Sequence, residues 1–256
     1  GSNELGDRTE YRGSYIRGEY DEEQGKFVNI DFTKKDESNN VVDTFNINGA
    51  LVNNFNVNGT LSGEKAIYIS PNALVKNINI AGNTDSYSFV VSGDIISEWN
   101  PEGVEYFYTR NYGGENPYEG LKPNIKLTDG ETLDDYRTNL NFNGDRIFND
   151  NIIGPYGINL NVNHGTLTTA NKNTNIDGLT GVSVNGVNIA SGATYSLNNT
   201  LTVGAGFGKI TVNGNLVLGE NGSIVTGFSN EKRIEAGLQN YNQSTSIINN
   251  GTVNLS

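Results

Sequence analysis

The sequence contains no cysteine and no methionine, and it has only 5 prolines, one tryptophan and one histidine in 256 residues. The missing cysteines exclude disulfide bonds, thiolate catalysis and zinc sites with cysteine ligands. No run of about 18 apolar residues occurs, so we expect no insertion into a membrane. Hydrophobic residues make up only 35% of the chain, which would leave a spherical core thin. These absences favour an elongated fold with a narrow shared core.

Positive charge is also scarce. The chain has 17 lysines and arginines against 29 aspartates and glutamates, a formal net charge of -12. The acidic residues are spread along the chain. This charge argues against nucleic acid and anionic membrane surfaces as partners. NFNGDRIFNDN (141–151) and other Asn/Asp corners could hold calcium through carbonyl and amide oxygens, but they lack the dense aspartate series of calcium-binding nonapeptide repeats. We therefore predict no metal and no cofactor, and we expect a monomer.

Asparagine and glycine are abundant, and they recur together. The stretch FNINGALVNNFNVNGTL (45–61) presents an alternating apolar and polar segment that ends in Asn-Gly, and then repeats it. By local rules such a segment predicts an antiparallel hairpin. Asparagine also tolerates the left-handed backbone conformation and forms side-chain ladders when turns stack.

The spacing of the strands favours a different fold. Apolar strand centres fall near Phe45, Phe55, Ile67, Ile78 and Phe89, at steps of about ten or twelve residues. Two steps come to about 22 residues, a length that suits one turn of a three-sided solenoid. We therefore predict an all-β, right-handed parallel β-helix, with Asn-Gly corners that need a positive φ. Its predicted interior includes Phe45, Ile47, Phe55, Val57, Ile67, Ile69, Ile78, Ile80, Val184, Ile210, Val212 and Ile247.

The predicted domain organisation has four parts. Residues 1–40 form an irregular N-terminal segment or the first coils, with strands beginning at Phe27–Phe32, and residues 41–95 form coils of the β-helix. Residues 96–140 form an extruded loop or small subdomain. Residues 141–256 return to β-helix coils.

The 96–140 insertion is the predicted recognition element. Aromatic side chains offer large contact areas at low entropic cost, and long loops on a rigid scaffold tend to carry function. The alternative is that these aromatics pack against the stem and cap an exposed flank. The predicted binding residues are Trp99, Tyr106, Tyr108, Tyr112, Tyr118 and Tyr136.

The sequence predicts no catalytic residue. His164 precedes a glycine at a position where related segments have asparagine, which favours a turn residue. A glycan lyase or hydrolase would need carboxylates that converge on one face. The candidates for that alternative are Asp129, Glu131, Asp134, Asp135, Asp145 and Asp150.

Three stretches carry a family resemblance. NGTLSGEKAIYISPNALVKNINIAG (58–82) and SIINNGTVNLS (246–256) resemble the passenger repeats of type V (Va) autotransporters, particularly the large fusobacterial outer-membrane ones. Residues 157–197 are similar to a passenger-associated transport repeat. The matching features there are Gly165-Thr166-Leu167, Asn173-Thr174, Val184-Asn185-Gly186 and Ser191-Gly192-Ala193.

The resemblance implies a secreted, cell-surface protein involved in virulence. It also implies anchoring to the outer membrane through a C-terminal barrel that this sequence does not include. Gly1-Ser2 is typical of a cloning scar, so we expect a segment of a longer precursor. The expected function is a non-catalytic adhesin stalk that presents its insertion to a host protein receptor, a glycan or another bacterium. The alternatives are a glycan-active β-helical enzyme and a purely structural segment for folding and export.

Overall fold

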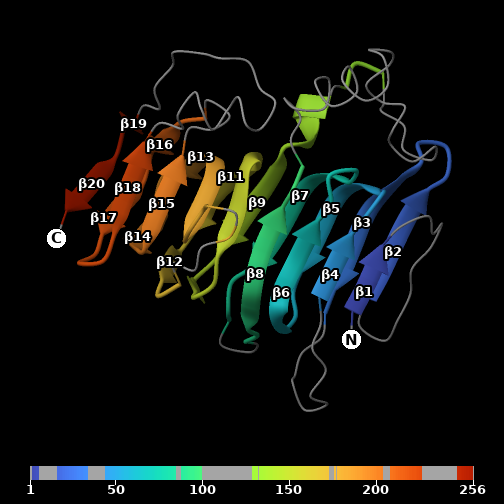
Figure 1. The fold of residues 1–256 in the computed structure, drawn as a ribbon, viewed down its shortest axis with the longest axis horizontal. Coiled ribbons are helices and arrows are strands. Elements are labelled where there is room, and N and C mark those ends of the chain that lie inside the picture. The colour runs from blue at the N-terminus through green and yellow to red at the C-terminus, as the bar shows by residue number, and fades with distance from the viewer. Residues whose placement is uncertain are drawn as a thin grey trace.

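The computed structural model describes residues 2–5, 16–33, 44–84, 88–99, 129–131, 133–172, 176, 178–203, 208–226 and 247–255. This part of the chain is all-β, and its strands lie side by side along the long axis of the molecule (Figure 1). The one helical element in these ranges is a 3-10 turn, η1 (Leu133–Tyr136). Every strand pair is parallel except β2 with β3. The predicted all-β class with parallel strands is confirmed.

The strands form a 15-stranded sheet and a 5-stranded sheet. The larger sheet has two arms, which join because β11 and β13 bend and contribute to both arms. The first arm contains β1 (Ser2–Leu5), β4 (Thr44–Ile47), β6 (Leu61–Ile69), β8 (Val91–Ser97), the first halves of β11 (Ile152–His164) and β13 (Val182–Ile189), β15 (Thr200–Val203) and β18 (Ser223–Thr226). The second arm contains β2 (Ile16–Asp21), β3 (Lys26–Phe32), β5 (Leu51–Val57), β7 (Leu74–Ala81), β9 (Thr138–Asn143), the second halves of β11 and β13, β16 (Ile210–Val212) and β19 (Ile247–Asn249). The small sheet contains β10 (Arg146–Phe148), β12 (Thr166–Ala170), β14 (Thr194–Asn198), β17 (Asn215–Leu218) and β20 (Thr252–Leu255).

The chain visits these layers in turn. β4 of the first arm is followed by β5 of the second arm, and β6 then returns to pair with β4. From β9 onward the order is second arm, small sheet and first arm, repeated to β20. Equivalent positions on neighbouring strands are therefore one circuit apart, as Asn54 and Asn77 are at a separation of 23 residues.

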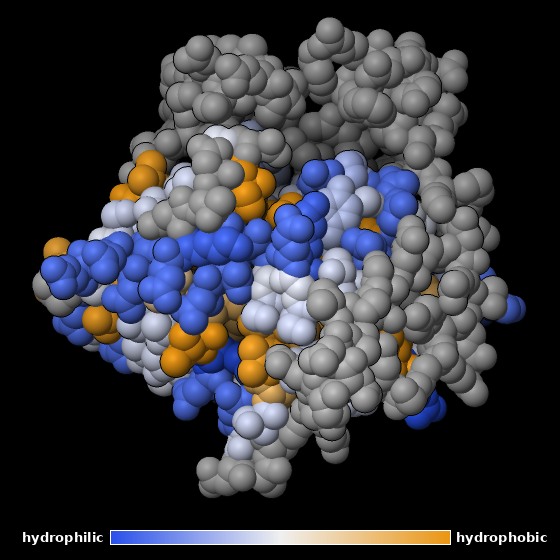
Figure 2. Space-filling view, turned by 60° about the horizontal axis from the view of Figure 1, so that its bottom comes forward, coloured by the Kyte–Doolittle hydropathy of each residue, from blue (hydrophilic) through white to orange (hydrophobic). Residues whose placement is uncertain are grey.

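The core lies between the arms, because alternate residues of each strand point inward. Phe45 of β4 and Phe55 of β5 meet edge to face at 4.6 Å between ring centroids, and Phe32 contacts Phe45 in the same way at 5.0 Å. All three rings are fully buried. On the face drawn in Figure 2, hydrophilic residues cover most of the described surface, with separate hydrophobic patches. The large hydrophobic side chains exposed in the described part are Val90, Ile147, Val225, Ile247, Ile248 and Leu255.

A ladder of asparagine side chains runs along the outside of the second arm. The Nδ2 group of Asn188 donates to Asn161, Asn161 to Asn141, Asn141 to Asn79, and Asn79 to Asn56, at 2.9–3.0 Å. Asn56 then donates to the carboxylate of Asp31 at 2.8 Å. Each amide donates in the same direction along the arm. The sequence predicts asparagine ladders where turns stack; this ladder instead consists of asparagines within strands.

We predict that Asn141→Ala lowers the free energy of unfolding by about 1–3 kcal/mol, because the half-buried Asn79 and Asn161 both lose their bond to Asn141. The measurement is urea unfolding followed by far-UV circular dichroism. Asn221→Ala, at an exposed turn, is the control and should change stability by less than about 0.5 kcal/mol. Equal effects of both substitutions would contradict a stabilising ladder.

The predicted Asn-Gly corners are partly wrong. Gly49 has the expected positive φ of 64°, and its N–H donates to Asn72 Oδ1 at 3.1 Å. Gly59, however, is not among the described glycines with positive φ. Gly186 lies inside β13, where that strand passes from the first arm to the second. The Asn-Gly pairs thus mark changes of direction, but they do not share one backbone conformation.

The start of the chain also differs from the prediction. Strand β1 pairs in parallel with β4, and β2 forms an antiparallel hairpin with β3, so strands begin well before Phe27. The irregular composition of residues 11–26 concealed β2. Its burial alternates only at Ile16 and Gly18, so the apolar pattern is short.

Candidate functional site

A hollow of about 570 Å³ lies on the outer side of the first arm. Strands β6, β8 and β11 contribute to it, together with the segment that follows β12. Its lining combines buried apolar side chains with charged groups. The lining residues are Glu64, Lys65, Asp94, Ile96, Ser97, Glu98, Trp99, Ile153, Pro155, Tyr156, Lys172, Ile176 and Leu179.

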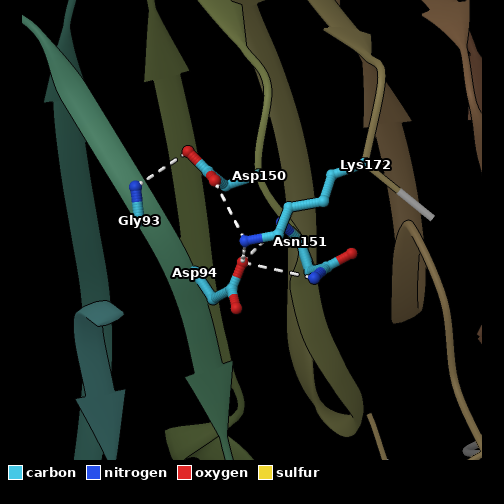
Figure 3. A network of polar contacts seen from close by, with 5 residues as sticks. All are labelled: Gly93, Asp94, Asp150, Asn151 and Lys172. Atoms are coloured by element: carbon cyan, nitrogen blue, oxygen red, sulfur yellow. Dashed lines mark hydrogen bonds and ion pairs between the residues drawn. The ribbon is translucent and has the colours of Figure 1, made fainter. Parts of the chain in front are cut away.

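Two of the lining residues, Asp94 and Lys172, belong to a polar network (Figure 3). Oδ1 of Asp94 lies 3.1 Å from Lys172 Nζ, and it accepts bonds from the backbone N–H of Asn151 at 2.9 Å and from Asn151 Nδ2 at 3.3 Å. Lys172 also contacts Asp150 Oδ1 at 3.3 Å. Asn151 is fully buried and Asp94 is 7% exposed. One ammonium group therefore joins two carboxylates from separate elements.

Local backbone geometry explains how these side chains converge. Gly93 has φ 108°, and a Cβ atom there would collide with the carbonyl oxygen of Gly63, so only glycine fits. Its N–H donates to Asp150 Oδ2 at 2.8 Å. Asn171, with φ 69°, is the one non-glycine residue of the described part in the left-handed region. This turn directly precedes Lys172, where the chain leaves β12.

The charges of the network stabilise one another. Burial lowers the pKa of Lys172, but its hydrogen bonds to Asp94 and Asp150 outweigh that effect and raise the pKa above its ordinary value. Lys172 is thus an ammonium in the folded protein at neutral pH. The network binds the segment after β12 to β8 and to the turn before β11.

A second polar group lies beside the hollow, on the same arm. The Tyr68 hydroxyl donates to Glu98 Oε2 at 2.6 Å, and Lys65 Nζ lies 4.9 Å from the centre of the Tyr68 ring. Burial, together with the bond to the Glu98 carboxylate and its charge, raises the pKa of Tyr68 from 10.0 to about 12. Glu64, Lys65 and Glu98 are exposed.

This raised pKa predicts an alkaline loss of stability. The stabilising contribution of neutral Tyr68 is complete below its unfolded pKa of 10.0 and is lost as the pH rises through about 12. We expect Tyr68→Phe to make the free energy of unfolding fall less steeply between these values. Urea unfolding at a series of alkaline pH values measures this. Tyr20→Phe, in the hairpin, is the comparison, and identical slopes for all three proteins would contradict the prediction.

The structure describes only part of the predicted recognition set. Trp99 is 1% exposed, and its indole Nε1 has no hydrogen-bond partner in the described part of the chain. Tyr136 is fully buried, donates to Glu131 Oε2 at 2.9 Å and lies beside Lys76, with Nζ 5.1 Å from the ring centre. Burial and the Glu131 carboxylate raise the pKa of Tyr136. These two rings therefore pack against the strands and do not project into solvent. Tyr106, Tyr108, Tyr112 and Tyr118 lie outside the described residues.

The candidate carboxylates whose contacts the structure describes have separate partners. Glu131 forms an ion pair with Lys76 at 2.8 Å, and Asp145 Oδ1 accepts the backbone N–H of Thr166 at 2.8 Å. Asp150 belongs to the Lys172 network. Asp129 is exposed, Asp135 is an exposed residue of η1, and the side chain of Asp134 is outside the described residues.

His164 is an exposed residue at the end of β11, opposite Asn143 and before Gly165, which has φ 67°. This placement agrees with a turn residue. Within the described ranges, no group of three or more histidine, aspartate or glutamate side chains is arranged to hold a metal ion. No helix in those ranges is long and apolar enough to cross a membrane.

Sequence reasoning missed Asp94, Asn151 and Lys172 as a group. Asp94 and Lys172 are 78 residues apart, and neither lies in a motif with known spacing. Only the parallel stacking of β8 beside β11 brings them together. Comparisons of the chain with models of protein families, with curated proteins and with solved structures found no match.

Proposed function

We propose that the chain is a non-catalytic stalk segment of a bacterial cell-surface protein, built as a right-handed parallel β-helix of the autotransporter passenger type. The observation that carries this proposal is the parallel register that continues along the second arm from β3 to β19. Each circuit of the chain adds one strand to an arm, so length grows along a single axis. The right-handed sense rests on the general preference of parallel crossovers.

The ladder and the missing cysteines support a stalk. A surface protein that crosses a membrane unfolded benefits from a fold that assembles circuit by circuit through neighbour contacts. Asparagine bonds between neighbouring circuits supply such contacts along the outside. The partner of the stalk is proposed to be a host protein receptor, a glycan or another bacterium, reached through the segment between β8 and β9.

The experiment replaces residues 101–128 with a glycine-serine sequence of equal length. These bounds retain Trp99, Tyr136 and Thr138, which are buried and belong to the stem. The variant should keep its strand content and its unfolding midpoint while losing adhesion when displayed on a bacterial surface. A matched control replaces residues 228–245 in the same way and should keep adhesion. Unchanged adhesion by the first variant would refute presentation by this segment.

A further inference from the structure

The geometry around Lys172 points to a covalent cross-link: we propose that Lys172 Nζ and Asn151 Cγ form an intramolecular amide, with Asp94 as the proton carrier. This inference concerns the stem and is independent of what the stalk binds. The three side chains come from β8, the residue before β11, and the segment after β12. They meet although the sequence separates Asp94 from Asn151 by 57 residues and from Lys172 by 78.

The first support is the shared carboxylate oxygen. Oδ1 of Asp94 contacts both the attacking nitrogen, Lys172 Nζ, at 3.1 Å and the leaving nitrogen, Asn151 Nδ2, at 3.3 Å (Figure 3). A group that contacts both nitrogens can take a proton from one and give it to the other. The fixed backbone N–H of Asn151, which donates to the same oxygen at 2.9 Å, holds the carboxylate in place.

The second support is the state of the Asn151 side chain. It is fully buried, and its Oδ1 atom accepts no hydrogen bond within the described part of the chain. Among the described contacts, the side-chain amide is therefore held only through its leaving nitrogen, whose acceptor is the same Asp94 oxygen that contacts Lys172. Holding reactants in one place replaces a bimolecular encounter, which raises effective concentrations to about 10⁵ M or more in well-oriented cases.

The reaction balances without any co-reactant. Asp94 takes a proton from the Lys172 ammonium, and the neutral amine attacks Cγ of Asn151. The Nζ–Cγ bond forms, Asp94 returns a proton to Nδ2, and the Cγ–Nδ2 bond breaks. Ammonia leaves and carries away the excess proton as ammonium. Asp94 ends as it began, while Lys172 loses its charge.

The bond would have a clear structural effect. Asn151 stands directly before β11, and Lys172 follows β12, so the amide would close the circuit that contains both strands. In a chain without cysteine, the amide would constrain the unfolded chain as a disulfide bond does in other proteins. Tension applied between the ends of the stalk would then bypass this circuit.

Intact-mass spectrometry of the folded, full-length chain tests the proposal. We expect a mass lower than the sequence mass by one ammonia. Trypsin should leave residues 147–209 as one peptide, because the modified Lys172 is no longer a cleavage site. Lys172→Arg keeps the ion pairs but cannot form the amide, so this variant should have its full sequence mass. Lys209→Arg, at an exposed lysine, is the control and should still lack one ammonia.

The variants also separate the cross-link from other reactions. Ring closure at an Asn-Gly pair loses ammonia too, but that loss would persist in Lys172→Arg and would overturn the proposal. Asp94→Asn should abolish the cross-link, whereas Asp150→Asn should retain it. A full sequence mass for the folded wild-type chain would refute the cross-link. Loss of water would exclude Asn151 as the partner and refute the proposal as stated.

Discussion

Phe55→Ala is expected to lower the free energy of unfolding by about 3–5 kcal/mol, the range typical of a phenylalanine removed from a packed core. Phe55 is fully buried at the centre of β5 and meets Phe45 from the opposite arm at 4.6 Å. Its strand neighbours in register are Ile30 and Ile78, which are also buried. Truncation would therefore leave a cavity with walls from both arms, and parallel strands fixed by their ladders cannot move to close it.

Urea unfolding monitored by far-UV circular dichroism measures this loss. Ile147→Ala provides the matched control, since Ile147 lies in a strand but is 70% exposed, and its truncation should change stability by less than about 0.5 kcal/mol. A loss below about 1 kcal/mol for Phe55→Ala would show that the arms do not pack against each other at this level. The edge-to-face contact between Phe45 and Phe55 would then contribute little to the stability of the core.

The core could be predicted because it depends on local alternation. Phe45, Ile47, Phe55, Val57, Ile67 and Ile69 were predicted to point inward, and all are fully buried, as are Ile78, Ile80, Val184, Ile210 and Val212. A residue's side of a strand follows from the period of two, whatever strand lies beside it. Ile247 is the exception. It was predicted to be buried but is 44% exposed, because β19 is the last described strand of its arm.

The corners could be predicted only in position. An Asn-Gly pair predicts that the chain can turn, but the backbone conformation of the turn depends on the residues that surround it in the fold. At Gly49 an amide from the next circuit, Asn72, accepts the N–H and the left-handed conformation results. At Asn185-Gly186 the chain bends within a continuous strand, because Val184 and Val187 pair with different strands. That choice depends on partners far away in the sequence.

The candidate site was the least predictable part. The sequence directed attention to aromatic residues, and of those described, Trp99 and Tyr136 pack into the stem. The Asp94, Asn151 and Lys172 group has no aromatic member and no repeated spacing. It exists because Gly93 permits β8 to approach the Gly63 carbonyl and because Asn171 turns the chain toward the first arm. Neither condition can be inferred from one sequence without the register of the strands.

In a Lys172→Arg background, which keeps the ion pairs but cannot form the amide, Asp94→Ala is expected to lower the free energy of unfolding by about 2–4 kcal/mol, because a carboxylate that is only 10% exposed is removed from a half-buried ion pair and from two buried donors. The substitution leaves the buried backbone N–H and Nδ2 of Asn151 without their acceptor, and the cation at position 172 keeps only Asp150. Asp94→Asn is the matched variant, because its amide oxygen can still accept the Asn151 N–H while the charge is lost. It should recover roughly half of the stability lost in the alanine variant, since a hydrogen bond to a buried N–H contributes about 1–2 kcal/mol.

Urea unfolding of both variants, at low salt and in about 0.5 M sodium chloride, separates the contribution of the ion pair from that of the hydrogen bonds to Asn151. The difference between the Lys172→Arg chain and the same chain carrying Asp94→Asn contains the ion pair, but salt should change it little, because partly buried charges are poorly screened. Lys76→Met, which breaks the ion pair with Glu131 beside η1, gives a second pair for comparison. If Asp94→Ala lowered the free energy of unfolding by less than about 1 kcal/mol, the network would contribute no more to stability than an exposed ion pair does. The position of the segment after β12 would then depend on the apolar residues Ile176 and Leu179, and not on the ion pair with Asp94.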